Sequence, residues 1–234
     1  MNILALIPAR GGSKGIPMKN IKKFGEKELI YWSIKIAKES KYINRIIVST
    51  DNEEIKEVAL KYGAEVPFIR PLEISNDLSN DYEFIKHCMD YLKNNGENIP
   101  DIIVQLRPTY PTRKLEILDE TIKIFIDEFN NYDSLRTVYK FEKSPFKMYM
   151  VNNKNLIPLF KNINNIKEPY NECRQLLPET YIHNGYIDII KSQIVYDKNS
   201  ITGNLIYPYI MSKDEYNDID TEEDWQLAEK KLHL

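Results

Sequence analysis

The sequence has little cysteine, and the cysteines it has form no recognisable framework. Only Cys88 and Cys173 occur, far apart and without a CxxC spacing. This excludes a zinc ribbon and a disulfide-rich secreted scaffold, and it favours a cytoplasmic protein with reduced thiols. We expect both thiols to be buried, as free cysteines in globular proteins usually are.

Long hydrophobic runs and an excess of one charge are also missing. The longest apolar runs, NILALIPA and RIIVST, have the length of a strand and fall short of the roughly 18 residues of a membrane helix. The first residues lack the basic segment of a signal peptide. A net charge of −3 and a pI near 5.8 give no electrostatic footprint for DNA or RNA. We therefore expect no membrane partner and no nucleic-acid partner.

The chain is long enough, at 234 residues with 42% hydrophobic content, for one globular domain with a small appendage. Strand-like and helix-like segments alternate along it. The strand-like segments are 2–8, 45–51, 64–70, 101–108 and 134–141, and the helix-like ones are 29–40, 53–63, 80–95 and 116–131. This alternation predicts an α/β fold with a doubly wound, mainly parallel sheet.

Residues 143–183 interrupt the alternation. They mix Phe and Tyr with Asn, Pro and Lys, show no helical period, and are too few to stabilise a core of their own. Their aromatic content favours a subunit contact. We expect residues 1–142 and 184–234 to form the α/β domain, closed by a helix with Asp220 or Thr221 as N-cap. The segment 143–183 is expected to be a dimerisation insertion of a homodimer.

A basic loop, IPARGGSKG, follows the first strand-like run. Five cations and no acid lie between Arg10 and Lys23, in a chain that is negative overall. A Walker A loop requires GxxxxGK[ST], but Gly15 is followed by Ile and Pro17; the same proline interrupts a GxGxxG dinucleotide fingerprint. Two interpretations remain open: a loop that holds a triphosphate with backbone N–H groups and cations, or a tight turn with solvated lysines.

Two further segments favour the triphosphate. RPTYPTR (107–113) ends a strand, at the edge where open α/β sheets bind ligands. In DIDTEED, Asp218 and Asp220 would face one side of an extended chain and could hold Mg²⁺ (or Mn²⁺), although an acidic helix start explains them as well. If the first interpretation is right, the N-terminal loop and these acids meet around one nucleotide and one metal ion.

Seven segments resemble, in the right order, those of the CMP-sugar acid synthetases. They are IPARGGSKGIPMKNI, VSTDNEEI, RPLEISND, LRPTYPTR, CRQLLP, HNGYIDI and YNDIDTEED. These cytidylyltransferases, with a nucleotide-diphospho-sugar transferase-like fold, activate N-acetylneuraminate and related nonulosonates such as legionaminate and pseudaminate. The resemblance implies that CTP and a small 2-keto sugar acid react to give a CMP-sugar and pyrophosphate.

The same resemblance implies the site residues. Nucleotide binding falls to Ala9, Arg10, Gly11, Ser13, Lys14, Asn20, Arg70, Ser79 and Asp81. Arg70 and the segment 75–81 match the loop that reads the base. Sugar binding falls to Arg107, Thr109, Tyr110, Arg113, Arg174, Gln175, Asn184 and Asp188. The catalytic residues would be Arg10, Lys19 and Asp220, and the metal ligands Asp218 and Asp220.

Some positions depart from the family pattern. The family commonly has Gln at Arg107, Ser at Tyr110 and Tyr at Asp188. Arg107 and Asp188 are expected either to form an internal ion pair or to bind a substituent that sialic acid lacks. Arg174 matches the family residue that meets the acidic sugar, and an arginine fork suits a carboxylate.

No histidine is required by the implied reaction. His87 and His233 are expected to be structural or solvated, and His183 matches a segment beside the sugar. A synthetase for the eight-carbon acid Kdo and a noncatalytic nucleotide-binding module remain the alternatives.

Overall fold

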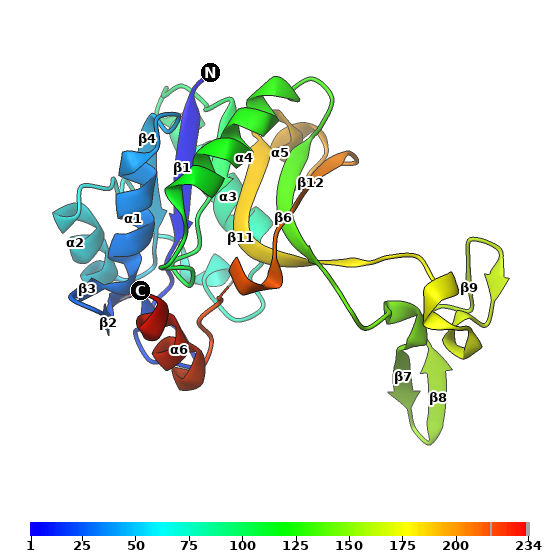
Figure 1. Ribbon diagram of the computed structural model, residues 1–234. Coiled ribbons are helices and arrows are strands. Elements are labelled where there is room, and N and C mark those ends of the chain that lie inside the picture. The colour runs from blue at the N-terminus through cyan, green and yellow to red at the C-terminus, as the bar shows by residue number, and fades with distance from the viewer. Residues whose placement is uncertain (216, 233–234) are drawn as a thin grey trace.

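A six-stranded sheet, in the order β12-β6-β11-β5-β1-β4, forms the centre of the protein (Figure 1). The computed structural model describes residues 1–215 and 217–232, so His233 lies outside the described residues. The strands of this sheet are β1 (Ile3–Pro8), β4 (Arg45–Ser49), β5 (Ile102–Gln105), β6 (Ser134–Lys140), β11 (Tyr181–Lys191) and β12 (Ile206–Ile210).

The sheet is mixed. β1 pairs in parallel with β4 and β5, and β12 pairs in parallel with β6, whereas β11 is antiparallel to both β5 and β6. The chain leaves the sheet at the end of β6 and enters it again at the start of β11. Because both points lie at the same end of the sheet, β11 must run antiparallel to β6. The edge strand β12 tolerates Pro208, as edge strands do.

Helices cover both faces, which confirms the doubly wound α/β prediction. They are α1 (Leu29–Glu39), α2 (Glu53–Lys61), α3 (Asp81–Asn94), α4 (Leu115–Asp127), α5 (Gln193–Asp197) and α6 (Glu222–Leu232). Apolar side chains of α1, α2 and α4 pack on one face of the sheet, and those of α3 and α5 on the other. Within the described residues, no helix combines the length and the apolar character that a membrane span needs.

Side chains that bind backbone amides of the first turn mark where two of the helices begin. Asn80 and Glu83 form a capping box that begins α3, which places Asp81 in its first turn. Of the two candidate N-caps of α6, Thr221 is confirmed, because its hydroxyl accepts the amide of Asp224 at 3.2 Å.

The prediction of a strand at 64–70 is wrong. Only an isolated bridge between Ile47 and Glu65 forms there, since Pro67 cannot donate to a ladder.

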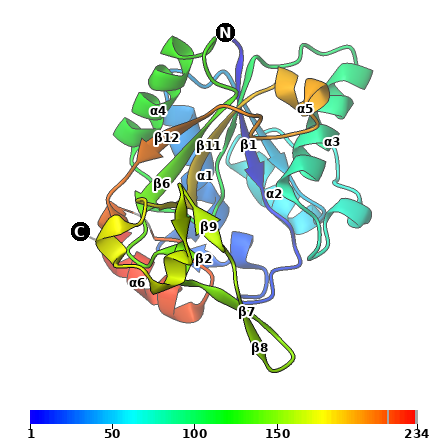
Figure 2. The ribbon, with the colours of Figure 1, turned by 90° about the vertical axis from the view of Figure 1, so that its right-hand side faces the viewer.

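An arm projects from the body between β6 and β11 (Figures 1 and 2). It carries two small hairpins, β7 (Tyr149–Asn152) with β8 (Asn155–Pro158) and β9 (Asn162–Ile163) with β10 (Ile166–Lys167). A further short pair, β2 (Lys23–Phe24) with β3 (Lys27–Glu28), precedes α1 in the body. The expectation of two buried thiols is half wrong: Cys88 of α3 is buried in the core, but Cys173 is exposed on the arm, which has too little core to cover it.

Asp133, just before β6, holds the chain segment that leads into β12. Its carboxylate accepts bonds from the ammonium of Lys198 at 2.7 Å and from the backbone amides of Asn204 and Leu205 at 2.7 and 3.1 Å. Burial raises the pKa of Asp133, but these donors outweigh it and lower the pKa to about 2.

Replacing Asp133 with Asn should therefore lower the free energy of unfolding by about 1–3 kcal/mol at pH 7. The folded-state pKa lies below the unfolded value of about 3.9, so the stabilisation is present above pH 4 and is lost as the pH falls toward 2. Urea denaturation would show that the difference in unfolding free energy between wild type and variant is smaller at pH 3 than at pH 7. Asp127→Asn, which removes only an exposed pair with Lys123, is the control; equal midpoints for wild type and Asp133→Asn at pH 7 would contradict the prediction.

Candidate active site

A cleft of about 480 Å³ opens where β1 and β5 end, on the edge at which parallel strands of open sheets bind ligands. Eleven of the predicted site residues lie on its wall. They are Arg10, Ser13, Lys14, Lys19, Asn20, Arg70, Ser79, Asp81, Arg107, Thr109 and Asp220. The structure thus brings most of the nucleotide set and the reactive set to one place.

The cations of the N-terminal loop contact the segment that precedes α3. A guanidinium nitrogen of Arg10 donates to the carbonyl of Asn76 at 2.8 Å, and the other lies 3.1 Å from the carboxylate of Asp77. Lys14 lies 2.5 Å from the same carboxylate. The hydrogen bond from Lys14 and the charge of Arg10 lower the pKa of Asp77. One carboxylate is therefore bound by both loop cations at the cleft.

Lys19 lies against the C-terminal acids. Its ammonium donates to the carbonyl of Ile219 at 2.6 Å and lies 3.2 Å from Oδ1 of Asp220, and only 13% of the side chain is exposed. Gly15 packs on the same segment: a Cβ built there would stand 2.3 Å from the carbonyl oxygen of Asp220. The expected meeting of the N-terminal loop with the C-terminal acids is confirmed.

Lys19 owes its direction to an unusual backbone. Met18 adopts a left-handed conformation with φ of 49°, and this turns the chain into the short 3₁₀ turn Lys19–Ile21. Residues other than glycine adopt this conformation at a cost of roughly 1–2 kcal/mol, and such residues collect at functional sites. The strain is thus located at the residue that aims the lysine into the cleft.

Asp218 lies behind the wall of the cleft. Its Oδ1 is buried and has no hydrogen-bond partner among the described residues. Burial raises the pKa of this carboxyl, the charge of Asp220 raises it further, and the hydroxyls of Thr109 and Tyr110 oppose them. The chain is held here by the amide of Ile219, which donates to the carbonyl of Thr109 at 3.1 Å.

The donor set fits a magnesium ion that keeps several non-protein ligands. An orphaned buried carboxylate oxygen of Asp218 beside the exposed carboxylate of Asp220 supplies two hard oxygen donors. No group of three or more potential ligands occurs in the described part of the chain. Mg²⁺ is commonly held by one or two carboxylates, with water and substrate phosphates completing its shell.

Arg70 forms part of the opposite wall. It is buried, donates through Nε to the hydroxyl of Ser49 at 3.0 Å, and lies over the ring of Phe84 at 4.9 Å. Burial lowers its pKa to about 10, which leaves it charged at neutral pH.

Arg107 is held by two carboxylates. It donates to Asp81 at 2.5 Å, to Asp188 at 2.6 Å and to the carbonyl of Gly185 at 3.1 Å. The internal ion pair expected between Arg107 and Asp188 is therefore present. Burial raises the pKa of Asp188, but the hydrogen bond from His183 and the charge of Arg107 lower it to about 2, so this carboxylate is charged.

Four predicted sugar-binding residues, Tyr110, Arg113, Asn184 and Asp188, lie inside the fold and not on the cleft wall. Arg113 donates to the carbonyls of Tyr186 and Arg107 at 2.8 and 3.0 Å, and the hydroxyl of Tyr110 donates to the carbonyl of Asn184. The expectation of a direct sugar contact is wrong for these four in this structure, because their polar groups bind other groups of the protein, Asp188 through its ion pair with Arg107.

Two of the amino acids predicted to bind the nucleotide, Ala9 and Gly11, also act through the backbone. Ala9 is fully buried, and the amide of Gly11 donates to Asp51 at 2.8 Å. Neither residue lies on the wall of the cleft, so their role is to shape the loop.

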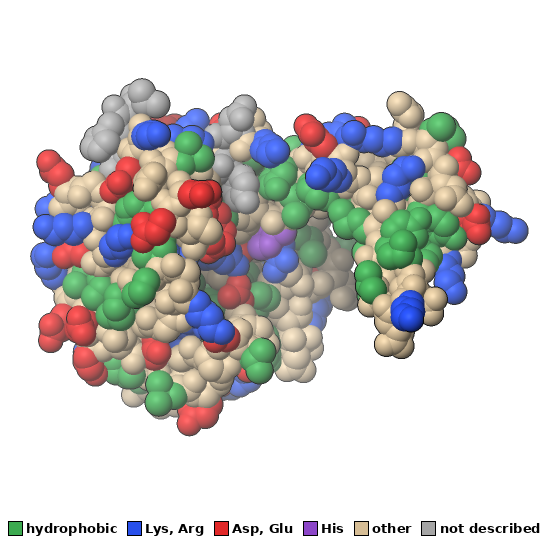
Figure 3. All heavy atoms as spheres, turned by 90° about the horizontal axis from the view of Figure 1, so that it is seen from below, with side chains coloured by type: hydrophobic (Ala, Val, Ile, Leu, Met, Phe, Trp, Pro, Cys, Tyr) green, Lys and Arg blue, Asp and Glu red, His purple; other side chains and the backbone are tan. Residues whose placement is uncertain are grey.

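Arg174 and Gln175 are not brought to the cleft. They line a separate pocket of about 310 Å³ at the base of the arm, together with Lys140 and Glu179. Figure 3 shows the arm standing apart from the body.

The wall residues Asn76, Asp77 and Asn80 lie in the segment 75–81, which the resemblance assigned to the base-reading loop, whereas Phe84 was not predicted. The sequence reasoning did not predict that Asp77 would bind Arg10 and Lys14; an acid in that segment and the excess of cations in the N-terminal loop were the available signal.

Comparisons with known proteins identify relatives of this chain. A family model described as Cytidylyltransferase matches residues 4–163. Pseudaminic acid cytidylyltransferase of Campylobacter jejuni subsp. jejuni is 31% identical, over 97% of this chain and 95% of its own length. CMP-N,N'-diacetyllegionaminic acid synthase of Legionella pneumophila subsp. pneumophila is 32% identical, over 100% and 97%. A solved structure of CMP:2-keto-3-deoxy-manno-octonic acid synthetase complexed with CTP shares the fold, with a TM-score of 0.70 at 13% identity over 100% and 99% of the two chains. The chain belongs to the cytidylyltransferase family.

Proposed function

We propose that this protein transfers CMP from CTP to a nonulosonic acid and releases pyrophosphate. The observation that carries the proposal is the convergence of Lys19 and Asp220 on one cleft whose wall also holds Arg10 and Lys14. Relatives that span nearly the whole chain are named for the same transfer to pseudaminic and N,N'-diacetyllegionaminic acid. CTP as the nucleotide fits the cytoplasmic location expected from the cysteine content.

The triphosphate would replace the internal anions of the loop. Arg10 and Lys14 would exchange the carboxylate of Asp77 for phosphate oxygens, and Lys19 would lie nearest the α-phosphate, where charge grows in the transition state. The anomeric hydroxyl attacks the α-phosphorus in line. The new P–O bond forms as the bond to the β-phosphate oxygen breaks, pyrophosphate leaves, and the hydroxyl proton passes to solvent.

The base and ribose would lie toward the wall built by Arg70, Asn20 and the segment 75–81. The amide of Asn20 donates to the carbonyl of Arg10 at 2.9 Å, so a residue at the nucleoside position also fixes the phosphate loop. The Arg70 guanidinium is fixed between Ser49 and Phe84, and its direction into the cleft is therefore set before any ligand arrives.

Asp218 and Asp220 would hold Mg²⁺. When bound, the ion would neutralise phosphate charge and lower the pKa of the attacking hydroxyl, which removes the need for a strong side-chain base. The contribution of the chain is to hold the two carboxylates: Ile219 between them is fully buried and bonded to Thr109, which fixes the backbone on both sides.

The arm, residues 143–183, would pair with a second copy of the chain. Its outer surface carries exposed apolar side chains, including Val151 at 74% and Leu156 at 66%. Figure 3 shows such side chains gathered on the arm. Arg174 and Gln175 lie in the pocket at its base and would serve the sugar of a cleft only from another subunit. A homodimer would cover the apolar surface.

The overall proposal is tested by pyrophosphate release. CTP should support turnover with at least one member of a panel of nonulosonic acids, whereas ATP, GTP and UTP should give little. Kdo is included in the panel as the rival acceptor. The proposal fails if no nonulosonic acid releases pyrophosphate, or if Kdo is the best acceptor.

Asp220→Asn should lower turnover by about 100-fold or more, because it removes a charged oxygen donor from the point where Lys19 and the phosphates meet. The matched control is Glu222→Gln in the first turn of α6, which breaks a similar pair with Lys22 at 2.6 Å. The measurement is the steady-state rate at saturating CTP and MgCl₂; equal rates for the two variants would rule out the role of Asp220.

Gly15→Ala should also lower turnover, by about 10-fold or more, since the added methyl would meet the carbonyl of Asp220 and push the loop away. Gly12→Ala is the natural comparison, because nothing lies within 4 Å of a Cβ there. Both variants should keep the circular dichroism spectrum of the wild type. Matching activities would show that this contact does not set the geometry of the site.

We expect the hairpin formed by β7 and β8 to make the contact between the two copies of the chain. Val151 and Leu156 face each other across β7 and β8, and replacing both with Lys should give a monomer by light scattering at micromolar concentration. Leu227→Lys, an exposed position on α6, should leave the mass unchanged. A wild-type protein that is already monomeric would refute the pairing.

A further inference from the structure

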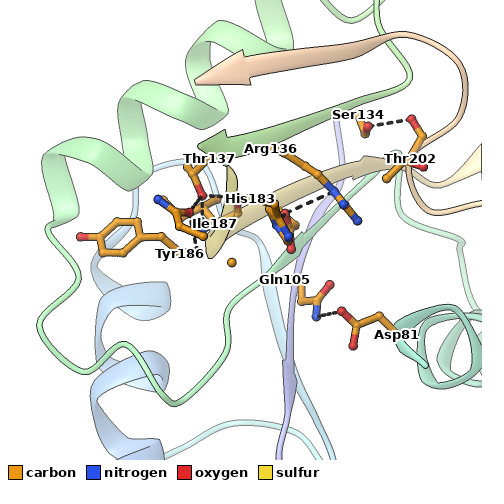
Figure 4. A network of polar contacts seen from close by, with 12 residues as sticks. Asp81, Gln105, Ser134, Arg136, Thr137, His183, Tyr186, Ile187 and Thr202 are labelled. Atoms are coloured by element: carbon orange, nitrogen blue, oxygen red, sulfur yellow. Dashed lines mark hydrogen bonds and ion pairs between the residues drawn. The ribbon is translucent and has the colours of Figure 1, made fainter. Parts of the chain in front are cut away.

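A row of polar side chains crosses the sheet beside the cleft. The strand register puts Arg136 of β6 opposite Asp188 of β11, and Asp188 opposite Gln105 of β5. Directly opposed residues project to the same face. Figure 4 shows Arg136, His183, Gln105 and Asp81 on one side of the sheet, the side that carries α3. Two guanidinium groups, those of Arg107 and Arg136, thus meet one carboxylate on this face.

Both carboxylate oxygens of Asp188 already accept a hydrogen bond. Its Oδ2 accepts from Arg107 at 2.6 Å and its Oδ1 from His183 at 2.7 Å, and only 4% of its side chain is exposed. Arg136 comes no closer than 3.8 Å, through Nε to Oδ1, which is too long for a hydrogen bond. Asp188 therefore gives Arg136 a nearby charge but no hydrogen bond.

The donors of Arg136 are otherwise unused. A guanidinium carries five N–H donors in a planar fork, and within residues 1–215 and 217–232 no side-chain hydrogen bond of Arg136 is found. About a quarter of the side chain, 27%, is exposed. A fork that projects from a sheet strand, is reachable from outside and has no hydrogen-bond acceptor among the described residues is suited to bidentate binding of a carboxylate.

Arg136 is connected to the cleft through a single carboxylate. Asp188 separates it from Arg107, and Arg107 lies on the wall of the cleft with Asp81. The charges of Arg107 and Arg136 balance those of Asp81 and Asp188, so the row is neutral before a ligand binds. An added carboxylate would supply acceptors to donors that have none, without requiring any internal pair to break.

We propose that Arg136 binds the carboxylate of the acceptor sugar acid, in the same subunit whose cleft holds the nucleotide. Asp188 is a positioning residue in this scheme, since it binds both Arg107 and His183 and lies 3.8 Å from Nε of Arg136. The inference rests on the proposed function and specifies one contact of it. It assigns the acid group to the body of the protein and not to Arg174 in the pocket of the arm.

The test compares two acceptors on three proteins. The acceptors are the best nonulosonic acid of the panel and its carboxamide, and the proteins are wild type, Arg136→Gln and Arg174→Gln. Wild type should prefer the acid strongly in kcat/KM. Arg136→Gln should raise the KM for the acid by about 10- to 100-fold and should lose most of the preference for acid over carboxamide. Its affinity for CTP, measured by calorimetry without acceptor, should change less than about twofold.

Arg136→Lys supplies the control for folding and charge. It keeps the cation but not the fork, so it should bind CTP normally and recover only part of the preference for the acid. A purely structural role for Arg136 would shift thermal stability or CTP affinity and would leave the acid-to-carboxamide ratio at the wild-type value, which overturns the inference.

The remaining outcomes are distinguishable. If wild type turns over the acid but Arg174→Gln alone loses the preference, the acid contact belongs to the arm, and the inference is overturned while the proposed function stands. If wild type releases pyrophosphate with no nonulosonic acid, the proposed function itself has failed.

Discussion

The contact of Lys19 with residues 219 and 220 is the constraint on which the site depends, since it joins two segments about 200 positions apart in the sequence. An ion pair with a largely exposed carboxylate contributes little by itself. The apolar cluster beneath it does more: Ile16 and Phe24 from the N-terminal side pack with Ile219 and Trp225 from the C-terminal side, and all four are buried. Burial fixes the two segments, and the polar contact then sets the direction of the lysine.

The same cleft shows how a cationic site is kept folded before its anion binds. Cations that lie close together repel one another unless an anion lies between them. Asp77 holds Arg10 and Lys14, and Asp220 holds Lys19. Under the proposed function, a triphosphate would replace these carboxylate oxygens with phosphate oxygens, so the cations would keep anionic partners throughout.

The sequence predicted what depends on periodicity and on local chemistry. Alternating segments indicated the doubly wound sheet, and the five cations from Arg10 to Lys23 together with the acids at 218 and 220 indicated the cleft. Features that depend on register could not be predicted. Asp188, Arg136 and Gln105 are distant in the chain and meet only because β11 runs antiparallel between β5 and β6. The burial of Arg113 was equally hidden, because a lone arginine in a loop gives no sign that carbonyl groups will enclose it.

The strand β11 gives these distant features a common origin. It starts at Tyr181, directly after Thr180 in the pocket of the arm, and its register shifts between His183 and Asp188. Gly185 lies in that irregularity with φ of +70°, and a Cβ there would stand 3.1 Å from Arg107, which donates to its carbonyl. The irregularity therefore lets His183 and Asp188 meet on one face and brings the backbone onto Arg107. One continuous strand therefore runs from the base of the arm to the carbonyl that binds the cleft arginine.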